Sequence, residues 1–235
     1  GKWSDSDIET EIIRRLREIT KRAEDGGIVC LHENCDTWGG QSFEHTLRLL
    51  DEIDSSAFSL VFDTGNPIET IDNRAGASNR YQDAFEFYEA VREHISYVHI
   101  KDGYREGEQT VYTQPGAGRA RIEETLRDLR HRGYDGGFSI EPHVAVVHHD
   151  PSVTADEQVR WNAFLEYARR TEDLLKHAGY RARYAGLHLR TIEWPFSWRT
   201  LLHPCPPALL SHGQRQLLHG LGQLSLPVRV SQAIT

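Results

Sequence analysis

Residues 28–34, IVCLHEN, join a short continuous apolar run to a carboxylate at its end. The run from Ile28 to Leu31 is too short for a helix and is typical of a strand that is buried on both faces of a parallel sheet. It follows two glycines that end an amphipathic helix, predicted over about residues 5–23, where Ile and Leu recur at spacings of three and four. The helix, the strand and Glu33 therefore form the first repeat of an α/β pattern.

The same pattern recurs three more times, with strands predicted at 58–62, 97–100 and 138–140 and helices at 42–53, 81–94, 122–132 and 156–178. Strict alternation of this kind predicts a parallel sheet wrapped by helices. The four strands end in Glu33, Asp63, His99 and Glu141. Functional side chains of a barrel gather at the C-terminal ends of several strands, whereas a doubly wound sheet usually carries a GxGxxG turn, which is absent here. The predicted fold class is therefore an α/β, parallel (β/α)8 TIM barrel.

The number of strands is smaller than a closed barrel needs, because the pattern supplies four of the eight. Residues 1–180 are expected to form a partial TIM barrel, and the absence of methionine together with the start at Gly1 favours an N-terminal truncation. From about residue 185 Leu, Pro, His and Arg dominate, Glu193 is the only acidic residue and lysine disappears. Residues 185–235 are expected to be an atypical C-terminal tail, either an extension that packs on the barrel or a non-native sequence.

The composition, 38% hydrophobic with a formal net charge of −8, is that of a globular chain without the basic field that draws nucleic acid or acidic membranes. No stretch is apolar over the length of a membrane span. Three cysteines, an odd number with no CxxC pair, fit a reducing compartment. We therefore expect a cytoplasmic protein that acts on small polar molecules, alone or as a homo-oligomer.

Three carboxylates and one imidazole at four successive strand ends make a hard, mostly oxygen ligand set. Such a set favours six-coordinate Mn²⁺, with Mg²⁺ or Co²⁺ as alternatives, over tetrahedral zinc. The competing interpretation is a structural charge network that holds no metal. Glu33 and Glu141 lie on non-adjacent strands and are the candidate proton carriers.

Four further residues near the strand ends are candidates for substrate binding. Lys101 and Arg105 follow His99 and could hold a hydroxyl, carboxylate or phosphate group. Trp38 follows the strand end at Glu33, and Asn66 follows the strand end at Asp63. They could supply an aromatic wall and an amide for a sugar. The competing interpretation of each is ordinary loop structure.

Several segments carry a resemblance to a known family: LHENCDTWGG (31–40), LVFDTGNP (60–67), YVHIKD (97–102), TQPGAG (113–118) and GYDGGFSIEPH (133–143). Together they resemble the xylose-isomerase-like sugar phosphate isomerase/epimerase family over about residues 5–178. The resemblance implies that the four strands are the fifth to eighth of the barrel. It also implies that Glu33, Asp63, His99 and Glu141 bind one divalent cation.

The implied chemistry is aldose–ketose isomerisation, ketose epimerisation or a related proton transfer next to a carbonyl, through an enediolate, on a sugar or sugar phosphate. A cyclitol dehydratase of the inosose type uses the same kind of site and stays an alternative, as does an inactive fragment or partner-dependent half-barrel. The sequence departs from the family at residues 115–118, where PGAG replaces PGEG and a loop carboxylate is missing. At Asn66 the ketose 3-epimerase and endonuclease branches carry a His, which disfavours both.

Three histidines follow the last predicted strand without any recognisable ligand spacing, and we expect them at the surface: His143, His148 and His149.

Overall fold

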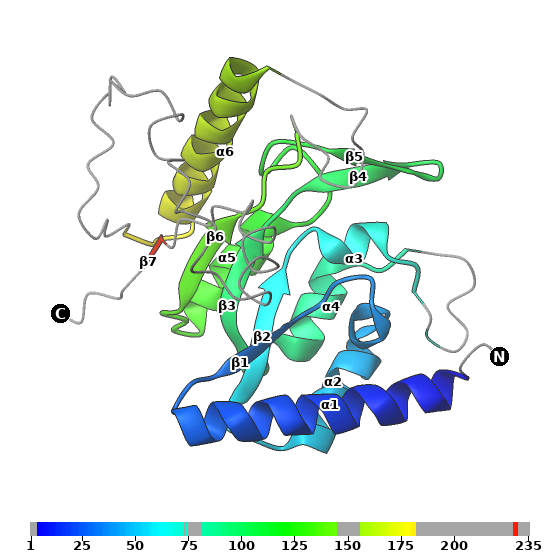
Figure 1. Cartoon of the computed structure of the whole chain (residues 1–235). Helices are drawn as coiled ribbons and strands as arrows, with labels where there is room; N and C mark the ends of the chain where they lie inside the picture. The colour runs from blue at the N-terminus through cyan, green and yellow to red at the C-terminus, as the bar shows by residue number, and fades with distance from the viewer. Residues whose placement is uncertain (1–3, 73, 75–80, 145–155, 182–227, 230–235) are drawn as a thin grey trace, which may run out of the picture.

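The computed structural model describes residues 4–72, 74, 81–144, 156–181 and 228–229. Its centre is a sheet of four parallel strands in the order β1-β2-β3-β6, which comprise Cys30–Glu33, Phe58–Asp63, Ile95–Ile100 and Gly137–Ile140 (Figure 1). The short β7 (Val228–Arg229) pairs with β6 in the antiparallel direction. Register aligns Asp63 with His99, so the ends of the two central strands lie side by side.

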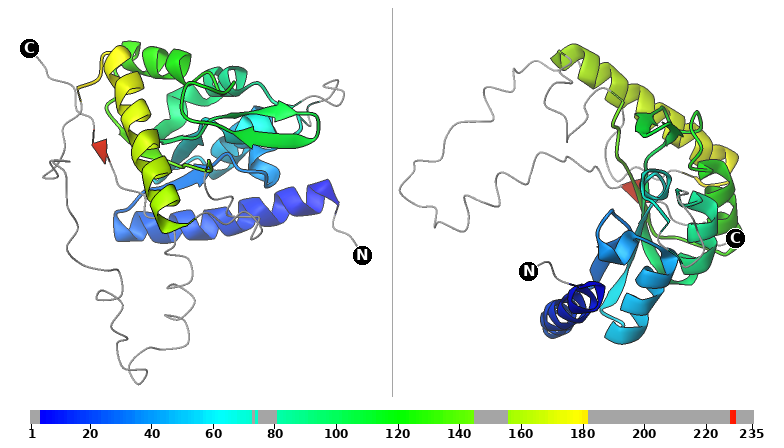
Figure 2. Two further views of the ribbon diagram at one scale, coloured as in Figure 1. Left: turned by 90° about the horizontal axis from the view of Figure 1, so that it is seen from above. Right: turned by 90° about the vertical axis from the view of Figure 1, so that its right-hand side faces the viewer.

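Five helices pack in chain order beside the sheet: α1 (Asp5–Gly26), α2 (Phe43–Ile53), α4 (Ala84–Val91), α5 (Ile122–His131) and α6 (Glu157–His177). Figure 2 shows α2, α4 and α5 along one face of the sheet. Local sequence explains where several of them begin, because the side chains of Ser4, Ser42, Asp83 and Asp156 accept hydrogen bonds from backbone N–H groups of the first turn. The predicted alternation of parallel strands and helices is confirmed.

The main hydrophobic core lies between the sheet and helices α4, α5 and α6. Phe62 and Val98 from the central strands meet Tyr88 of α4 and Leu126 of α5, and all four are at most 1% exposed. A smaller cluster between α1, α2 and the start of β2 contains Ile13, Leu49 and Phe58. Burying side chains of this size stabilises each by about 1.5–3 kcal/mol, so the sheet gives the strand ends a rigid base.

Strand β1 differs from its prediction. Burial on both faces was expected, but Ile28, Val29 and Leu31 are 63%, 55% and 40% exposed. The reason is that β1 is the edge of the described sheet, so it has a neighbouring strand on one side alone. The strand itself also begins two residues later than the apolar run, at Cys30.

Two short elements were not predicted, and both rise from the strand ends that carry the candidate ligands (Figure 1). The helix α3 (Asn66–Glu69) follows β2, and an antiparallel hairpin of β4 (Gly103–Glu106) and β5 (Gln109–Tyr112) follows β3. The predicted helix at 81–94 is shorter than expected, since α4 ends at Val91 and the turn η2 (Arg92–His94) leads into β3. A further turn, η1 (Trp38–Gly40), precedes α2.

Most of the expected C-terminal tail, residues 185–235, lies outside the described residues, as do His148 and His149. The division of the chain near residue 180 therefore stays a prediction. Among the described helices, none has an apolar stretch of the length that a membrane crossing requires.

Candidate metal centre

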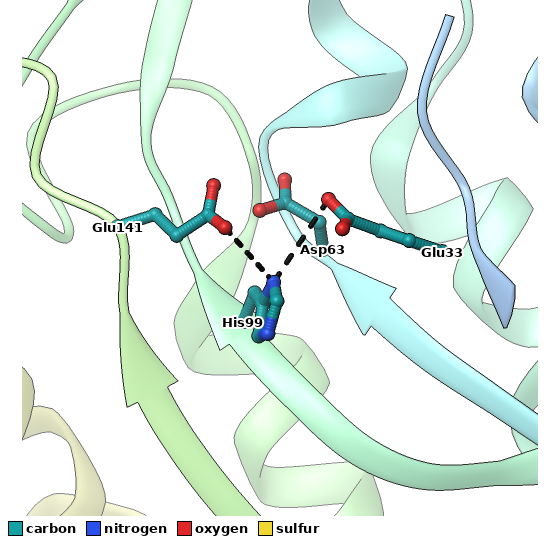
Figure 3. A group of neighbouring side chains, drawn as sticks. All are labelled: Glu33, Asp63, His99 and Glu141. Carbon is teal, nitrogen blue, oxygen red and sulfur yellow. Dashed lines mark ion pairs between the residues drawn. The ribbon is translucent and has the colours of Figure 1, made fainter. Parts of the chain in front are cut away.

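The structure brings together the side chains at the ends of the four parallel strands. Glu33, Asp63, His99 and Glu141 come from β1, β2, β3 and the residue after β6, and each offers one ligand atom within 4.8 Å of all the others. Figure 3 shows the three carboxylates converging above the His99 ring. Convergence follows from the parallel topology, because strands of equal direction end at the same edge of the sheet.

Asp63 is fully buried and is held by backbone and amide groups. Its backbone N–H donates to Asn34 Oδ1 at 2.7 Å, and Asn34 Nδ2 donates back to the Asp63 carbonyl at 3.0 Å. The carboxylate oxygen Oδ1 accepts from the N–H groups of Gly65 (2.8 Å) and Asn66 (2.7 Å) at the start of α3. The second oxygen, Oδ2, is buried and has no hydrogen-bond partner among the described residues.

His99 lies between two of the carboxylates. Its Nδ1 is 3.0 Å from Glu141 Oε1 and 3.9 Å from Glu33 Oε1 (Figure 3). Burial opposes protonation of the ring, but the neighbouring carboxylates Glu141 and Glu33, together with the charge of Asp63, outweigh it and raise the pKa of His99 to about 10. In the absence of a cation, a proton on His99 therefore balances part of the acidic charge.

Lys101 supplies a second positive charge, although one interpretation of the sequence placed it in an exposed loop. It is 5% exposed, and its Nζ donates to Asn66 Oδ1 at 2.5 Å. The same Nζ lies 3.4 Å from Glu141 Oε2 and 3.5 Å from Asp63 Oδ1. Thr64 fixes the strand end, because its hydroxyl donates to the Lys101 carbonyl and accepts from the Lys101 N–H.

Burial and charge set the pKa values of the carboxylates in opposite directions. Burial raises the pKa of Asp63 to about 7 against the opposing charge of Lys101. Burial acts in the same sense on Glu141, but the His99 hydrogen bond and the charge of Lys101 lower its pKa to about 2. The nearby His99 lowers the pKa of Glu33 against the effect of burial. Carboxylates this close repel one another unless protons or a cation compensate them.

This donor set fits a hard divalent cation. Three carboxylates and one imidazole nitrogen are available at one point, and the buried Asp63 Oδ2 is an acceptor that no described group uses. Oxygen-rich sites of this kind suit Mn²⁺ or Mg²⁺. A bound cation would balance the acidic charge in place of the proton on His99. That proton must leave, because the ring nitrogen can act as a ligand only when it is unprotonated.

Two of the four side chains, Glu33 and Glu141, line a cavity of about 450 Å³. Glu33, Glu141 and Lys101 line one part of it, and Asn66 lies between them, where its Nδ2 donates to Glu33 Oε1 at 3.0 Å. Arg105 of β4 also lines the cavity, with hydrogen bonds to Thr110 and Tyr81 of 2.6 Å each. Lys101, Asn66 and Arg105, predicted as substrate-binding residues, thus lie together at the cavity; that they bind substrate stays a prediction.

Trp38 does not occupy the place that the sequence analysis assigned to it. Its side chain is 5% exposed and packs with Ile13 and Leu49 in the smaller core cluster, while its indole N–H donates to Asp5 at 3.1 Å. It does not border the cavity. An aromatic wall formed by Trp38 is therefore excluded, because the η1 turn directs the ring toward α1 and not toward the strand ends.

His143 is another correction, because a surface position was expected. It is 8% exposed, stacks edge-on against Tyr112 at 4.7 Å between ring centroids, and lines the cavity. Further lining residues were missed from the sequence, among them Glu69, Thr70 and Thr110. They lie on α3, just after it and on β5, elements too short to show a period, so no pattern pointed to them.

Comparisons with known proteins place the fold of the chain among TIM barrels of one family. The chain is 25% identical over 134 residues to an inosose dehydratase of Lacticaseibacillus casei, a match that covers 54% of this chain and 44% of that protein. Among solved structures, a xylose isomerase-like TIM barrel protein of Mycobacterium smegmatis in complex with magnesium is similar with a TM-score of 0.55 and 19% identity, covering 76% of this chain and 54% of that one. A D-psicose 3-epimerase of Clostridium cellulolyticum H10, solved with D-tagatose, has a TM-score of 0.52 and 17% identity, covering 76% and 57%.

The chain thus spans a little under half the length of the first curated relatives that it matches, 44% to 46%. The family model described as the xylose isomerase-like TIM barrel matches residues 1–164, a span that contains all four parallel strands and the four converging side chains. Because this match covers most of the sequence and the fold agrees with it, the chain belongs to the xylose isomerase-like TIM barrel family.

Proposed function

We propose that the chain carries the metal centre of a divalent-metal-dependent isomerase or epimerase that acts on a sugar or sugar phosphate. The observation that carries the proposal is the convergence of Glu33, Asp63, His99 and Glu141 beside a polar cavity. Mn²⁺ is the favoured ion, with Mg²⁺ or Co²⁺ as alternatives, because hard oxygen ligands predominate.

A cation at this centre would polarise a substrate carbonyl and offset the negative charge that develops when the adjacent carbon loses a proton. Glu33 and Glu141 enter from opposite edges of the ligand group, on β1 and after β6. The Oε1 atom of Glu33 accepts from Asn66, while Oε2 makes no hydrogen bond with a described residue and can take a proton. Glu141 Oε2 lies beside Lys101, which suits the return of a proton on the other side. In this scheme removal of the proton gives an enediolate intermediate, and reprotonation at the neighbouring carbon or from the opposite face gives the isomerised or epimerised sugar.

The named relatives support this class of chemistry without choosing within it. The D-psicose 3-epimerase acts on a ketose, and its similarity to this chain is one of fold. A cyclitol dehydratase is the second candidate, favoured by the match to the inosose dehydratase of Lacticaseibacillus casei. Both reactions begin with removal of a proton next to a carbonyl, so the same carboxylates serve either.

The test is incubation of the purified chain with Mn²⁺ in D2O with free ketoses, their phosphates and scyllo-inosose, after which a chelating resin removes the paramagnetic ion. Proton NMR then follows loss of the signal from the carbon next to the carbonyl, and the product distinguishes isomerisation or epimerisation from loss of water. We expect exchange that depends on the metal. Binding of Mn²⁺ without exchange or turnover of any probe would contradict catalysis by this chain and would fit a half-barrel that depends on a partner.

Glu141→Gln is the decisive variant, because it removes a ligand charge and a proton carrier at nearly constant volume. We expect turnover to fall by more than tenfold, equivalent to more than about 1.4 kcal/mol of barrier. Glu108→Gln is the matched control, since Glu108 lies exposed in the turn between β4 and β5 and away from the cavity. If Glu141→Gln keeps a rate within tenfold of the wild type, Glu141 takes no part in the chemistry.

A further inference from the structure

The cavity lining includes a second group of polar residues, called the second end below, which Lys101 joins to the ligand group, with its Nζ 3.6 Å from Glu69 and 3.4 Å from Glu141. This end is formed by Glu69 at the close of α3, by Thr70, and by Arg105 and Thr110 of the β4–β5 hairpin. It contains both hydrogen-bond acceptors and donors on short elements that follow β2 and β3. A substrate that reaches the metal centre with its carbonyl would place its remaining groups here.

Glu69 is the carboxylate of this second end, and it is held in one orientation. Tyr112 of β5 donates its hydroxyl to Glu69 Oε2 at 2.6 Å, which ties α3 to the hairpin. The other oxygen, Oε1, lies 3.6 Å from Lys101 Nζ and accepts no hydrogen bond from a described residue. The side chain is 24% exposed and borders the cavity, so Oε1 is an oriented acceptor within reach of a ligand.

Arg105 is the donor of the second end, and it is equally fixed. Its guanidinium lies over the Tyr81 ring at 4.1 Å from the centroid and donates to Thr110 and to the Tyr81 hydroxyl. A fixed donor and a fixed acceptor in one cavity suit hydroxyl groups, each of which both donates and accepts. A phosphate group, which at neutral pH is an acceptor, matches Arg105 but not Glu69.

The charge of the whole cavity points the same way. Four carboxylates line it, those of Glu33, Asp36, Glu69 and Glu141, against the cations Lys101 and Arg105. Asp63 lies buried beside Glu33 and Glu141 and adds a further negative charge when ionised. A bound divalent cation reduces this excess to about one negative charge, with His99 and His143 neutral. The cavity as a whole is thus not positive, and a dianionic phosphate beside Glu69 would be repelled by that carboxylate.

We propose that Glu69, oriented by Tyr112, accepts a hydrogen bond from a substrate hydroxyl and selects free polyhydroxy carbonyl compounds over their phosphate esters. The inference rests on the proposed function, since it concerns the same cavity, and it narrows the substrate from a sugar or sugar phosphate to the uncharged sugar. Glu69 is a specificity residue in this scheme and not a ligand of the cation.

The test compares D-fructose and D-tagatose with their 6-phosphates as probes. Saturation-transfer NMR gives the dissociation constant of each probe for the wild type, Glu69→Gln and Glu108→Gln, with Mn²⁺ replaced by Mg²⁺ to avoid paramagnetic broadening. We expect the wild type to bind the free ketoses more tightly than their phosphates. In Glu69→Gln this preference should shrink at least tenfold, which corresponds to about 1.4 kcal/mol, while Glu108→Gln should keep it.

Tyr112→Phe gives an independent measurement if Glu69→Gln does not fold. It removes the group that orients Glu69 but leaves its charge, so the affinity for the free ketoses should fall several-fold while the phosphates stay excluded. An unchanged preference in Glu69→Gln, a wild type that prefers the phosphates, or a wild type that binds none of the probes would each overturn the inference. A separate Mn²⁺ titration tests the proposed function, and Glu69→Gln should bind the ion like the wild type. A wild type that binds no ion refutes the metal centre, but the affinities for the free ketoses and their phosphates can still be compared.

Discussion

Replacement of Asp102 should destabilise the protein through the backbone, because this buried side chain organises the segment that links the hairpin to α5. Its Oδ1 accepts from the N–H groups of Gly103 (2.8 Å) and Ala120 (3.1 Å). Its Oδ2 accepts from those of Gly116 (2.8 Å) and Gly118 (3.1 Å). A Cβ atom at Gly118 would lie 2.2 Å from Asp102 Oδ1, so the loop closes directly onto the carboxylate.

The magnitude follows from these four bonds. In Asp102→Asn the amide oxygen can still serve Gly103 and Ala120, which are buried, while the amide NH2 group faces the N–H groups of Gly116 and Gly118. Leaving a buried N–H group without an acceptor costs about 1–3 kcal/mol, but the exposed Gly116 can turn to water. Burial raises the pKa of Asp102, so a neutral side chain also recovers some desolvation cost. We expect a loss of about 2 kcal/mol for Asp102→Asn and about 4 kcal/mol for Asp102→Ala.

Urea unfolding at pH 7, followed by tryptophan fluorescence, measures this loss. With a slope of about 1–3 kcal/mol per molar urea, a loss of about 2 kcal/mol moves the midpoint down by about 1 M. Asp135→Asn is the matched control, because Asp135 is exposed in the turn before β6 and should change stability by less than about 0.5 kcal/mol. Equal midpoints for Asp102→Asn and Asp135→Asn would show that the four bonds do not organise the loop.

Two further predictions concern the cation and the acid side of stability. Mn²⁺ at a hundred times its dissociation constant should stabilise the fold by about 2.7 kcal/mol, seen as a higher melting temperature that EDTA reverses; the same shift in Asp63→Asn would argue against the metal centre. Asp128 accepts hydrogen bonds from Tyr88, Arg92 and Arg132, and these bonds outweigh burial and lower its pKa. Its contribution to the free energy of unfolding is therefore fully present above the unfolded pKa of about 3.9 and is lost as the pH falls through the folded pKa. Asp128→Asn should cost about 1–2 kcal/mol at pH 7 and flatten this part of the pH profile of urea unfolding.

The parallel strands and their ligand-bearing ends could be predicted because the signals are local. An apolar run and the residue that ends it lie within six positions, and parallel topology then brings Glu33, Asp63 and His99 to one edge without further information. The strands were nevertheless expected to be equally buried, and β1 is not. Burial depends on which neighbour lies beside a strand, and no single segment contains that information.

The second end of the cavity could not be predicted for a related reason. Glu69 closes a helix of four residues, which is too short for an amphipathic period, and Tyr112 reaches it across 43 positions of sequence. The side chain of Trp38 was misplaced because an aromatic residue near a strand end can turn either toward the cavity or into the core. The direction of the ring depends on α1, because Asp5 of that helix accepts a hydrogen bond from the indole N–H of Trp38, 33 positions away in the sequence.

The geometry of Asp63 bears on whether the ligand group is a metal centre or a charge network that needs no metal. A structural network satisfies each buried oxygen, because an unpaired buried acceptor costs free energy that the fold must offset elsewhere. Here every neighbour of Asp63 acts on Oδ1 or on the backbone: Asn34 pairs with the backbone, and Gly65 and Asn66 donate to Oδ1. Oδ2 is buried, and among the described residues no donor reaches it, although the Asp63 carboxylate lies in the group with Glu33, Glu141 and His99. One oxygen of Asp63 is thus held by hydrogen bonds while the other is available to a cation. This favours the metal centre over the structural network.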